Sequence, residues 1–487
     1  MEAEEARSDQ PLTMNGQEAG GDEDINAPLL PVDEEPLFPV ACNVRKITQF
    51  LACLSVTCGA FCLGTVLAWT SPVGERLKKG DLGFPISQAQ LGWVGSLAGL
   101  GAALMSPIAG QLVDRLGRKA CMIALCAPLC AGWLLVAFAK NPAMLYSGRL
   151  ISGASGGAFC VAIPVYVSEV AHPAMRGALG SLFQLQVVMG VEMAYVIGPL
   201  VPVFWLSAIS AILPVVAAMA ILVFAPESPS YLLRRGRLNA AHDSLQWLWG
   251  NDCDLRRELN EMTRQSSTER SISIKTVFLQ RATLIAVGLM AFQQFSGINA
   301  VVFYTEEIFA AAGGSVQGAT AAAIVGAVQV AATFLSFLIV DKAGRRPLLL
   351  LSGAVMAACC TTLGAFFFFK DRGQDLSSLG MLPVLTVCLY FVVFSLGFGP
   401  VPWLMLGELF APEVKGVAGS VASATSWWLT FVVTAQFEPV VSAIGEGPTF
   451  WCFASLTTIG VLFVALFVPE TKGRTLEQIQ TSLNSPS

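Results

Sequence analysis

Three side-chain amides stand close together in one apolar stretch of the sequence, at Gln293, Gln294 and Asn299. An amide in hydrocarbon is costly unless it finds a hydrogen-bond partner, and each amide can both donate and accept. Gly297 lies between them and can loosen a helix at that point. The group therefore predicts one wall of a binding site for a neutral ligand with hydroxyl groups, such as a sugar. The alternative is hydrogen bonding between neighbouring helices.

A second apolar stretch carries polar side chains at helical spacing. Gln184 and Tyr195 are eleven residues apart, so in a helix they differ by about 20° of rotation and can face the same cavity. Glu192 lies about 80° away on that helix. An acid inside a membrane-spanning stretch can take up a proton during transport, or it can simply bond a neighbouring helix.

A third stretch interrupts its own helix. Pro400 and Pro402 each remove a backbone hydrogen bond, and such breaks are tolerated in a membrane only where the helix is buried or lines a cavity. The Trp403 indole beside them offers an apolar face for a sugar ring and an N–H for a hydroxyl group. The alternatives for Trp403 are packing or an anchor at the membrane interface.

Long apolar runs must position all of these residues. The chain of 487 residues is 54% hydrophobic and 13% charged, about half the charge of a soluble globular protein. This composition nearly excludes a soluble enzyme, and with two histidines and no metal-ligand or phosphate-binding pattern we predict no catalysis, cofactor, metal or nucleic-acid partner. Runs of about 20 apolar residues suit a bilayer core of about 30 Å. We expect twelve membrane-spanning helices, near 47–70, 91–113, 119–139, 143–168, 178–199, 203–225, 283–305, 318–340, 347–369, 381–407, 417–437 and 449–468.

The expected spans form two groups of six, so the predicted fold is an all-α membrane protein with two six-helix bundles. Residues 1–39 hold eleven of the 34 acids and one of the 29 bases, a net charge of 1 − 11 = −10, which predicts a disordered tail. The basic turns at 114–119 and 341–346, with an even number of spans, predict that both termini are cytosolic. The expected divisions are an acidic tail at 1–45, bundles at 46–225 and 281–468, a cytosolic linker with short helices at 226–280, and a cytosolic tail at 469–487.

Charged motifs recur at corresponding places in the two halves, which predicts two parallel six-helix repeats. Acids and bases at neighbouring helix ends can form a network of ion pairs that biases a two-state equilibrium. The alternative is that each charge only marks topology or caps a helix. We predict a cytosolic latch formed by Asp114, Arg118, Glu169, Arg176, Asp341, Arg345, Glu408 and Lys415.

With these motifs described, residues 45–480 resemble the sugar porters of the major facilitator superfamily, in particular class III facilitative glucose transporters and insect facilitated trehalose transporters. Nine strings in family order carry the resemblance. They are GQLVDRLGRK (110–119), GRLISG (148–153), PVYVSEVAHPAMRG (164–177), PESPSYLL (226–233), QQFSGINAVVFY (293–304), DKAGRR (341–346), GPVPW (399–403), GELF (407–410) and VPETKGRTLEQI (468–479).

The resemblance implies alternating access around one central sugar site in the major facilitator fold. Ser426 departs from the Asn that is common in glucose transporters, which leaves the sugar open. Ser395 replaces a common Glu, and Ser230 replaces the usual Arg of PESPR. The positions that match the family's sugar ligands are Gln184, Gln293, Gln294, Asn299, Trp403 and, where relatives often have Asn, Gln329.

The first predicted helix bears on proton coupling. Proton-coupled relatives carry an Asp there, in a string like FGYD, whereas this chain has Leu-Gly-Thr-Val at 63–66. The resemblance therefore implies facilitative uniport of glucose or a related hexose. The alternatives are facilitated transport of trehalose, proton-coupled sugar symport through Glu192, and a non-transporting sugar receptor, which the short C-terminal tail disfavours.

Leu29 and Leu30 follow an acidic stretch of the N-terminal tail and resemble the di-leucine sorting signals of class III glucose transporters. The nearest acid, Asp24, lies five residues before Leu29, where the usual pattern has four. We predict a clathrin adaptor as a partner, with an acidic solubilising tail as the alternative. The plasma membrane and endosomal or lysosomal membranes both stay open as locations.

Overall fold

The computed structural model describes residues 45–172, 175–250, 255–267, 281–312, 317–410, 412–472, 474 and 478–479. The predicted signal at Leu29 and Leu30 lies outside this part, as do the side chains of Arg176, Asp341 and Lys415. The described residues form helices and turns without a strand. Twelve helical spans among them are long and apolar enough to cross a membrane, which confirms the predicted all-α fold.

The first six spans pack as one bundle in which neighbouring helices approach closely at small residues. A Cβ on Gly64 would lie 2.0 Å from the Val187 carbonyl oxygen, so this glycine lets two helices touch through their backbones. The first span consists of two helices with a junction at Trp69. The helices of this bundle are α1 (Lys46–Ala68), α2 (Thr70–Lys78), α3 (Gln88–Leu116), α4 (Arg118–Ala137), α5 (Pro142–Val170), α6 (Arg176–Ile197) and α7 (Val203–Phe224).

The last six spans contain two broken helices. The seventh span breaks at Gly297, whose φ of 86° is open to glycine at little cost, and the tenth breaks between Leu396 and Val401. Both breaks fall where the sequence suggested a loosened helix. The helices are α12 (Arg281–Phe295), α13 (Ile298–Ala312), α14 (Gly318–Ala343), α15 (Arg345–Asp371), α16 (Leu382–Leu396), α17 (Val401–Leu409), α18 (Pro412–Ile444) and α19 (Glu446–Phe467).

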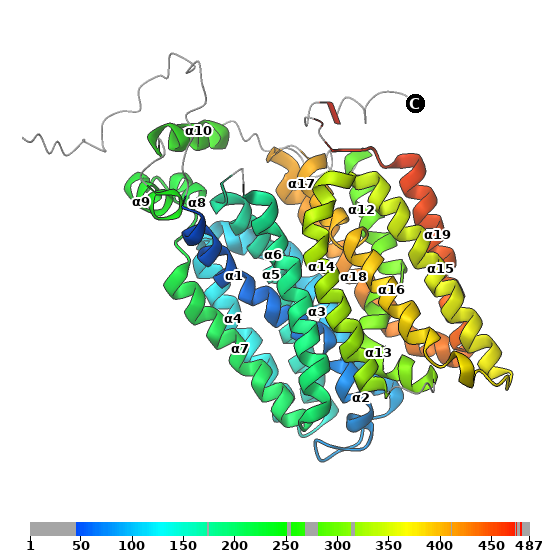
Figure 1. The fold of residues 1–487 in the computed structure, drawn as a ribbon. Coiled ribbons are helices and arrows are strands. Elements are labelled where there is room, and N and C mark those ends of the chain that lie inside the picture. The colour runs from blue at the N-terminus through cyan, green and yellow to red at the C-terminus, as the bar shows by residue number, and fades with distance from the viewer. Residues whose placement is uncertain are drawn as a thin grey trace, which may run out of the picture. The chain divides into compact units, whose positions relative to one another are not determined.

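Three short helices follow the first bundle: α8 (Pro229–Arg234), α9 (Leu238–Trp249) and α10 (Leu255–Ser267). The Trp249 indole donates to the Val170 carbonyl at 3.1 Å, and the Trp249 carbonyl accepts from the Arg45 amide at 3.0 Å. The helix α9 is thereby fixed to the end of α5 and the start of α1. We call this end of the bundles the linker end, and the opposite end, which carries α2, the loop end (Figure 1).

Candidate binding site at the centre of the bundles

The three predicted amides lie around the break between α12 and α13 and form one hydrogen-bonded group. Asn299 donates to Gln294 Oε1 at 2.5 Å, and Gln294 Nε2 donates to Ser426 Oγ at 2.9 Å. Thr430 Oγ1 lies 3.1 Å from both the Asn299 amide nitrogen and Gln294 Oε1. Because two hydroxyls of α18 meet two amides of α12 and α13, the group can exchange these bonds for those of a hydroxyl-bearing ligand.

Gln293 faces a different neighbour. Its Nε2 donates to the carbonyl oxygens of Phe398 at 2.5 Å and Gly399 at 3.1 Å, both in the break between α16 and α17. Its Oε1 accepts from Gln294 Nε2 at 3.3 Å. Gln293 therefore braces the broken tenth span, while its oxygen joins the amide group.

The other predicted ligands lie on three further helices. Gln329 on α14 is 4% exposed, and its Oε1 has no hydrogen-bond partner among the described residues. Gln184 on α6 and Trp403 on α17 are both half-buried. An unpaired buried oxygen is costly, so Gln329 is the predicted ligand with the clearest capacity for a further bond.

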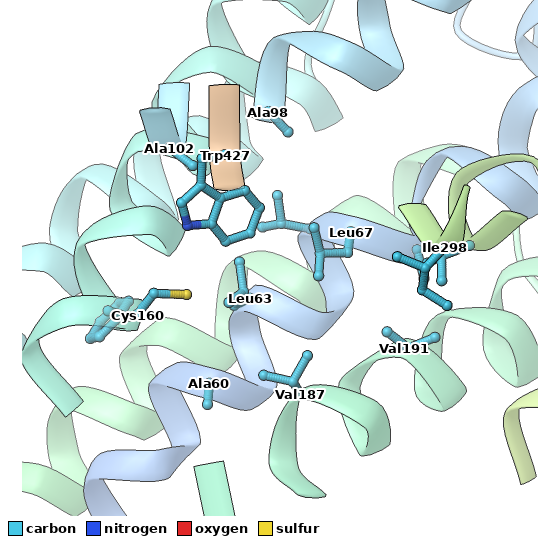
Figure 2. Close-up of a cluster of buried hydrophobic side chains, with 14 of the residues drawn as sticks. Ala60, Leu63, Leu67, Ala98, Ala102, Cys160, Val187, Val191, Ile298 and Trp427 are labelled. Carbon is cyan, nitrogen blue, oxygen red and sulfur yellow. The ribbon is translucent and has the colours of Figure 1, made fainter. Parts of the chain in front are cut away.

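Sequence reasoning missed Trp427, which follows Ser426 on α18. Its indole lies among apolar residues of the first bundle, and its nitrogen is buried without a hydrogen-bond partner in the described part of the chain (Figure 2). The amides of the second bundle therefore have an apolar counterpart in the first. The residues gathered there include Ala60, Leu63 and Leu67 of α1, Ala98 and Ala102 of α3, Cys160 of α5 and Val187 and Val191 of α6.

Glu192 lies where α6 of the first bundle meets α14 of the second. A Cβ on Gly326 would lie 1.8 Å from Glu192 Oε2, so the glycine leaves the room that the carboxyl group occupies. This oxygen is buried and has no hydrogen-bond partner among the described residues. The predicted bond from Glu192 to a neighbouring helix is thus not formed by this oxygen.

Hydrogen bonds and an ion pair join the two bundles at the loop end. Lys78 of α2 lies 3.2 Å from Glu307 of α13, and Ser71 of α2 accepts from the Glu306 amide at 3.1 Å. Tyr195 of α6 donates to the Val302 carbonyl at 2.7 Å. Since α2 and α6 belong to one bundle and α13 to the other, these bonds hold the bundles together at this end.

At the linker end the ion pairs of Arg118 lie within the first bundle, and Glu169 also pairs with Arg234 of α8 at 3.1 Å. Arg118 donates two hydrogen bonds of 2.8 Å to Glu169, and its Nη2 lies 3.1 Å from Asp114. Arg118 and Glu169 are 2% and 13% exposed, so their pair is mostly buried, whereas Asp114 is 65% exposed. Glu227 accepts the amides of Arg118 and Lys119 at the start of α4, which caps that helix.

The second half repeats this arrangement. Arg345 lies 2.8 Å from Glu408, and Glu470 accepts the amide of Arg345 at 3.0 Å at the start of α15. Burial raises the pKa of Glu470, but the backbone N–H groups of Lys472, Arg345, Arg346 and Thr471 outweigh it and the pKa is lowered. The described ion pairs of the predicted latch therefore connect helices of one bundle, and a latch between the bundles stays a prediction.

The described residues thus form two bundles of six candidate membrane spans around a polar centre, with two broken helices beside it. Residues 47–483 match the family described as "Sugar (and other) transporter". The chain therefore belongs to this sugar transporter family, which confirms the resemblance.

Relatives of similar sequence are transporters from insects. The chain is 38% identical over 453 residues to the facilitated trehalose transporter Tret1 of Polypedilum vanderplanki, which covers 91% of this chain and 90% of that protein. It is also 38% identical over 444 residues to Tret1 of Aedes aegypti, covering 90% of this chain and 55% of that protein. The chain thus spans about half the length of some relatives that it matches.

Solved structures of the E. coli xylose transporter XylE share the fold. One, a proton:xylose symporter bound to 6-bromo-6-deoxy-D-glucose, gives a TM-score of 0.76 at 24% identity and covers 90% of this chain and 99% of that one. Another, in a partially occluded inward open conformation, gives a TM-score of 0.77 at 24% identity and covers 88% of this chain and 100% of that one. The major facilitator fold of this chain is thereby established.

Proposed function

We propose that this chain carries a neutral sugar across a membrane by facilitative alternating access, with glucose or a related hexose as the substrate. The observation that carries the proposal is the amide group of Gln294 and Asn299, placed at the break of the seventh span and bonded to α18 hydroxyls. Amides and hydroxyls recognise sugar hydroxyls without a fixed charge. Membership of the sugar transporter family supports the same conclusion.

Trehalose is the second candidate, because relatives 38% identical over nine-tenths of this chain are named facilitated trehalose transporters. Both sugars are neutral and rich in hydroxyl groups, so the amide group suits either. Uptake of labelled glucose, fructose and trehalose into liposomes that contain the purified protein separates them. Uptake of none of the three would refute the proposal.

We propose further that transport is not coupled to protons. Residues 63–66 lie on α1 and include no acid. Val66 is fully buried and Gly64 packs against the α6 backbone, so these two positions leave no room for a carboxylate side chain. A pH gradient across the liposomes should leave the final sugar level at equilibrium. Accumulation above equilibrium would contradict uniport and would point to Glu192 at the α6–α14 contact, whose Oε2 has no hydrogen-bond partner among the described residues.

We also propose that the linker end faces the cytosol and that Leu29 and Leu30 direct the protein to internal membranes. The basic turns support the orientation, and an adaptor pocket would need both apolar side chains. Replacing both leucines by alanine should move a tagged protein to the plasma membrane and raise sugar uptake by intact cells. As a control, alanine at Leu12 and Val32 of the same tail should leave the distribution unchanged. A double leucine variant distributed like the parent would contradict the signal.

A further inference from the structure

The breaks of the seventh and tenth spans lie side by side in the second bundle. The first break places Ser296 and Gly297 between α12 and α13, and the second places Gly397 to Pro400 between α16 and α17. A break frees backbone carbonyls that an unbroken helix would pair, and inside a membrane protein these carbonyls need new partners. In this chain each broken span supplies partners for the other.

The first half of this exchange runs from α12 to the tenth span. Gln293 Nε2 donates to the carbonyls of Phe398 and Gly399, which lie in the second break. Gln293 is 4% exposed and Phe398 is 1% exposed. Water therefore has little access to replace these bonds.

The second half runs from α16 back to the seventh span. Tyr390 Oη lies 3.0 Å from the Ser296 carbonyl oxygen and 3.1 Å from Ser296 Oγ, and its single proton is shared between them. Ser296 Oγ in turn donates to the Gln293 carbonyl at 2.7 Å. The hydrogen bonds run from Tyr390 through Ser296 and Gln293 to Phe398. The backbone between Tyr390 and Phe398, eight residues further on, closes them into a ring, which we call the hydrogen-bonded ring.

The ring joins segments that lead to opposite ends of the bundle. Beyond the first break, α13 reaches the loop end, where Glu307 pairs with Lys78 of the other bundle. Beyond the second break, α17 reaches the linker end, where its Glu408 pairs with Arg345. A shift of either break strains the bonds to the other.

We propose that Tyr390 is a positioning residue that ties the two breaks together, so that α13 and α17 change orientation as one unit when the transporter changes state. The inference rests on the proposed function for its role in transport. The ring also fixes the amide of Gln293 and, through it, the neighbouring Gln294 that we assign to the sugar site. Tyr390 then acts on the sugar site without contacting the sugar.

Hydrogen–deuterium exchange on the purified full-length chain tests the tie without any sugar. Tyr390→Phe keeps the phenyl group and removes the hydroxyl, so both of its bonds to Ser296 are lost. Ser296→Ala removes only the Oγ acceptor and leaves the Ser296 carbonyl, which still accepts from Tyr390. A coupled pair requires Tyr390→Phe to raise amide exchange in α13 by roughly fivefold, and Ser296→Ala to raise it in α17 by a smaller factor. Tyr166→Phe is the matched control, because Tyr166 is equally buried and its hydroxyl donates to the Pro226 carbonyl at 2.9 Å in the other bundle.

Faster exchange in α13 and α17 for both variants, with neither changed by Tyr166→Phe, would support the tie. Changes confined to the span that carries the substitution would overturn it. In liposomes, Tyr390→Phe should lower the maximal rate of glucose or trehalose transport several-fold while the half-saturating sugar concentration stays near that of the parent. A parent that carries neither sugar would count against the proposed function, and the exchange comparison would still decide the role of Tyr390.

Discussion

The two ends of the bundles are held by different kinds of contact. At the loop end, Lys78, Ser71 and Tyr195 of the first bundle bond α13 of the second. At the linker end, the described pairs of Arg118 and Arg345 lie within one bundle each. If the bundles move as rigid bodies, opening the loop end must break bonds, whereas the linker-end pairs can persist at any angle between the bundles.

This difference changes what charged residues at each end are expected to do. A bond between the bundles contributes to the equilibrium between transport states, because it exists in one state and is lost in the other. A bond within a bundle contributes to folding stability in both states. Substitutions at the two ends should therefore affect different measurements.

The largest expected effect is on stability at the linker end of the first bundle. Arg118→Ala removes two hydrogen bonds from the Glu169 carboxylate, which is 13% exposed and keeps Arg234 at 3.1 Å and the Ser228 hydroxyl. Because this buried charge is only partly stranded, we expect a cost of about 2 kcal/mol, below that of a buried charge left with no partner. The melting temperature of the purified protein in detergent should fall accordingly. Arg345→Ala is the matched comparison, and it should cost less because its partner Glu408 is 27% exposed.

The same variants also test the predicted latch. A latch between the bundles would make Arg118→Ala increase labelling at the linker end by a water-soluble reagent while the melting temperature stays near that of the parent. A lower melting temperature with unchanged labelling would establish the pair as part of one bundle. Only the first result would show that these charges affect the equilibrium between transport states.

The centre belongs to neither end, and its amides should affect transport more than stability. Gln294→Ala removes the acceptor of Asn299 and Thr430, and Asn299→Ala removes one donor to that acceptor. Each should lower transport efficiency by roughly tenfold or more, with Gln294 the larger of the two because it removes bonds to both Asn299 and Thr430. Uptake is measured at equal amounts of folded protein. Normal uptake by both variants would show that these amides do not bind the sugar.

Apolar run lengths and internal repeats predicted the twelve spans and the two bundles, because membrane thickness restricts helix length so strongly. The glycine and proline positions also predicted both helix breaks. The partners across the breaks were not predictable, because the ring from Tyr390 to Ser296 joins residues 94 positions apart. A tyrosine in an apolar stretch gives no sign of which distant carbonyl it meets.

The grouping of the candidate site residues was predictable to a similar degree, and their role in binding sugar stays a prediction. The amides were found because polar groups are rare in apolar runs, and that signal also applies to Ser426 and Thr430, four residues apart on one helix face. Trp427 was missed because an aromatic residue in a membrane span usually packs or anchors. The loop-end bonds depend on how two separate bundles meet, which no local pattern in either half encodes.

A smaller effect is expected at the loop end. Lys78→Ala removes the ion pair with Glu307 between the bundles, and because the two side chains are 26% and 16% exposed, solvent screening limits the change to about 1 kcal/mol. The population open at the loop end should rise roughly fivefold, which increases deuterium exchange in α13. Glu75→Gln is the control, because Glu75 pairs with Lys78 only within α2, and an equal rise for both variants would assign the effect to α2 itself.

The smallest expected effect concerns acid and the second bundle at the linker end. The lowered pKa of Glu470 means that the unfolded chain binds its proton more readily than the folded chain does. The stabilisation is present above the ordinary glutamate pKa of about 4.3 and is lost as the pH falls through the lower folded-state value. The melting temperature of Glu470→Gln should therefore fall less than that of the parent when the pH is lowered from about 6 to about 3.5. Since this carboxylate caps α15 within its own bundle, sugar uptake at neutral pH should change little, and an unaltered acid profile would show that the cap adds no pH-dependent stability.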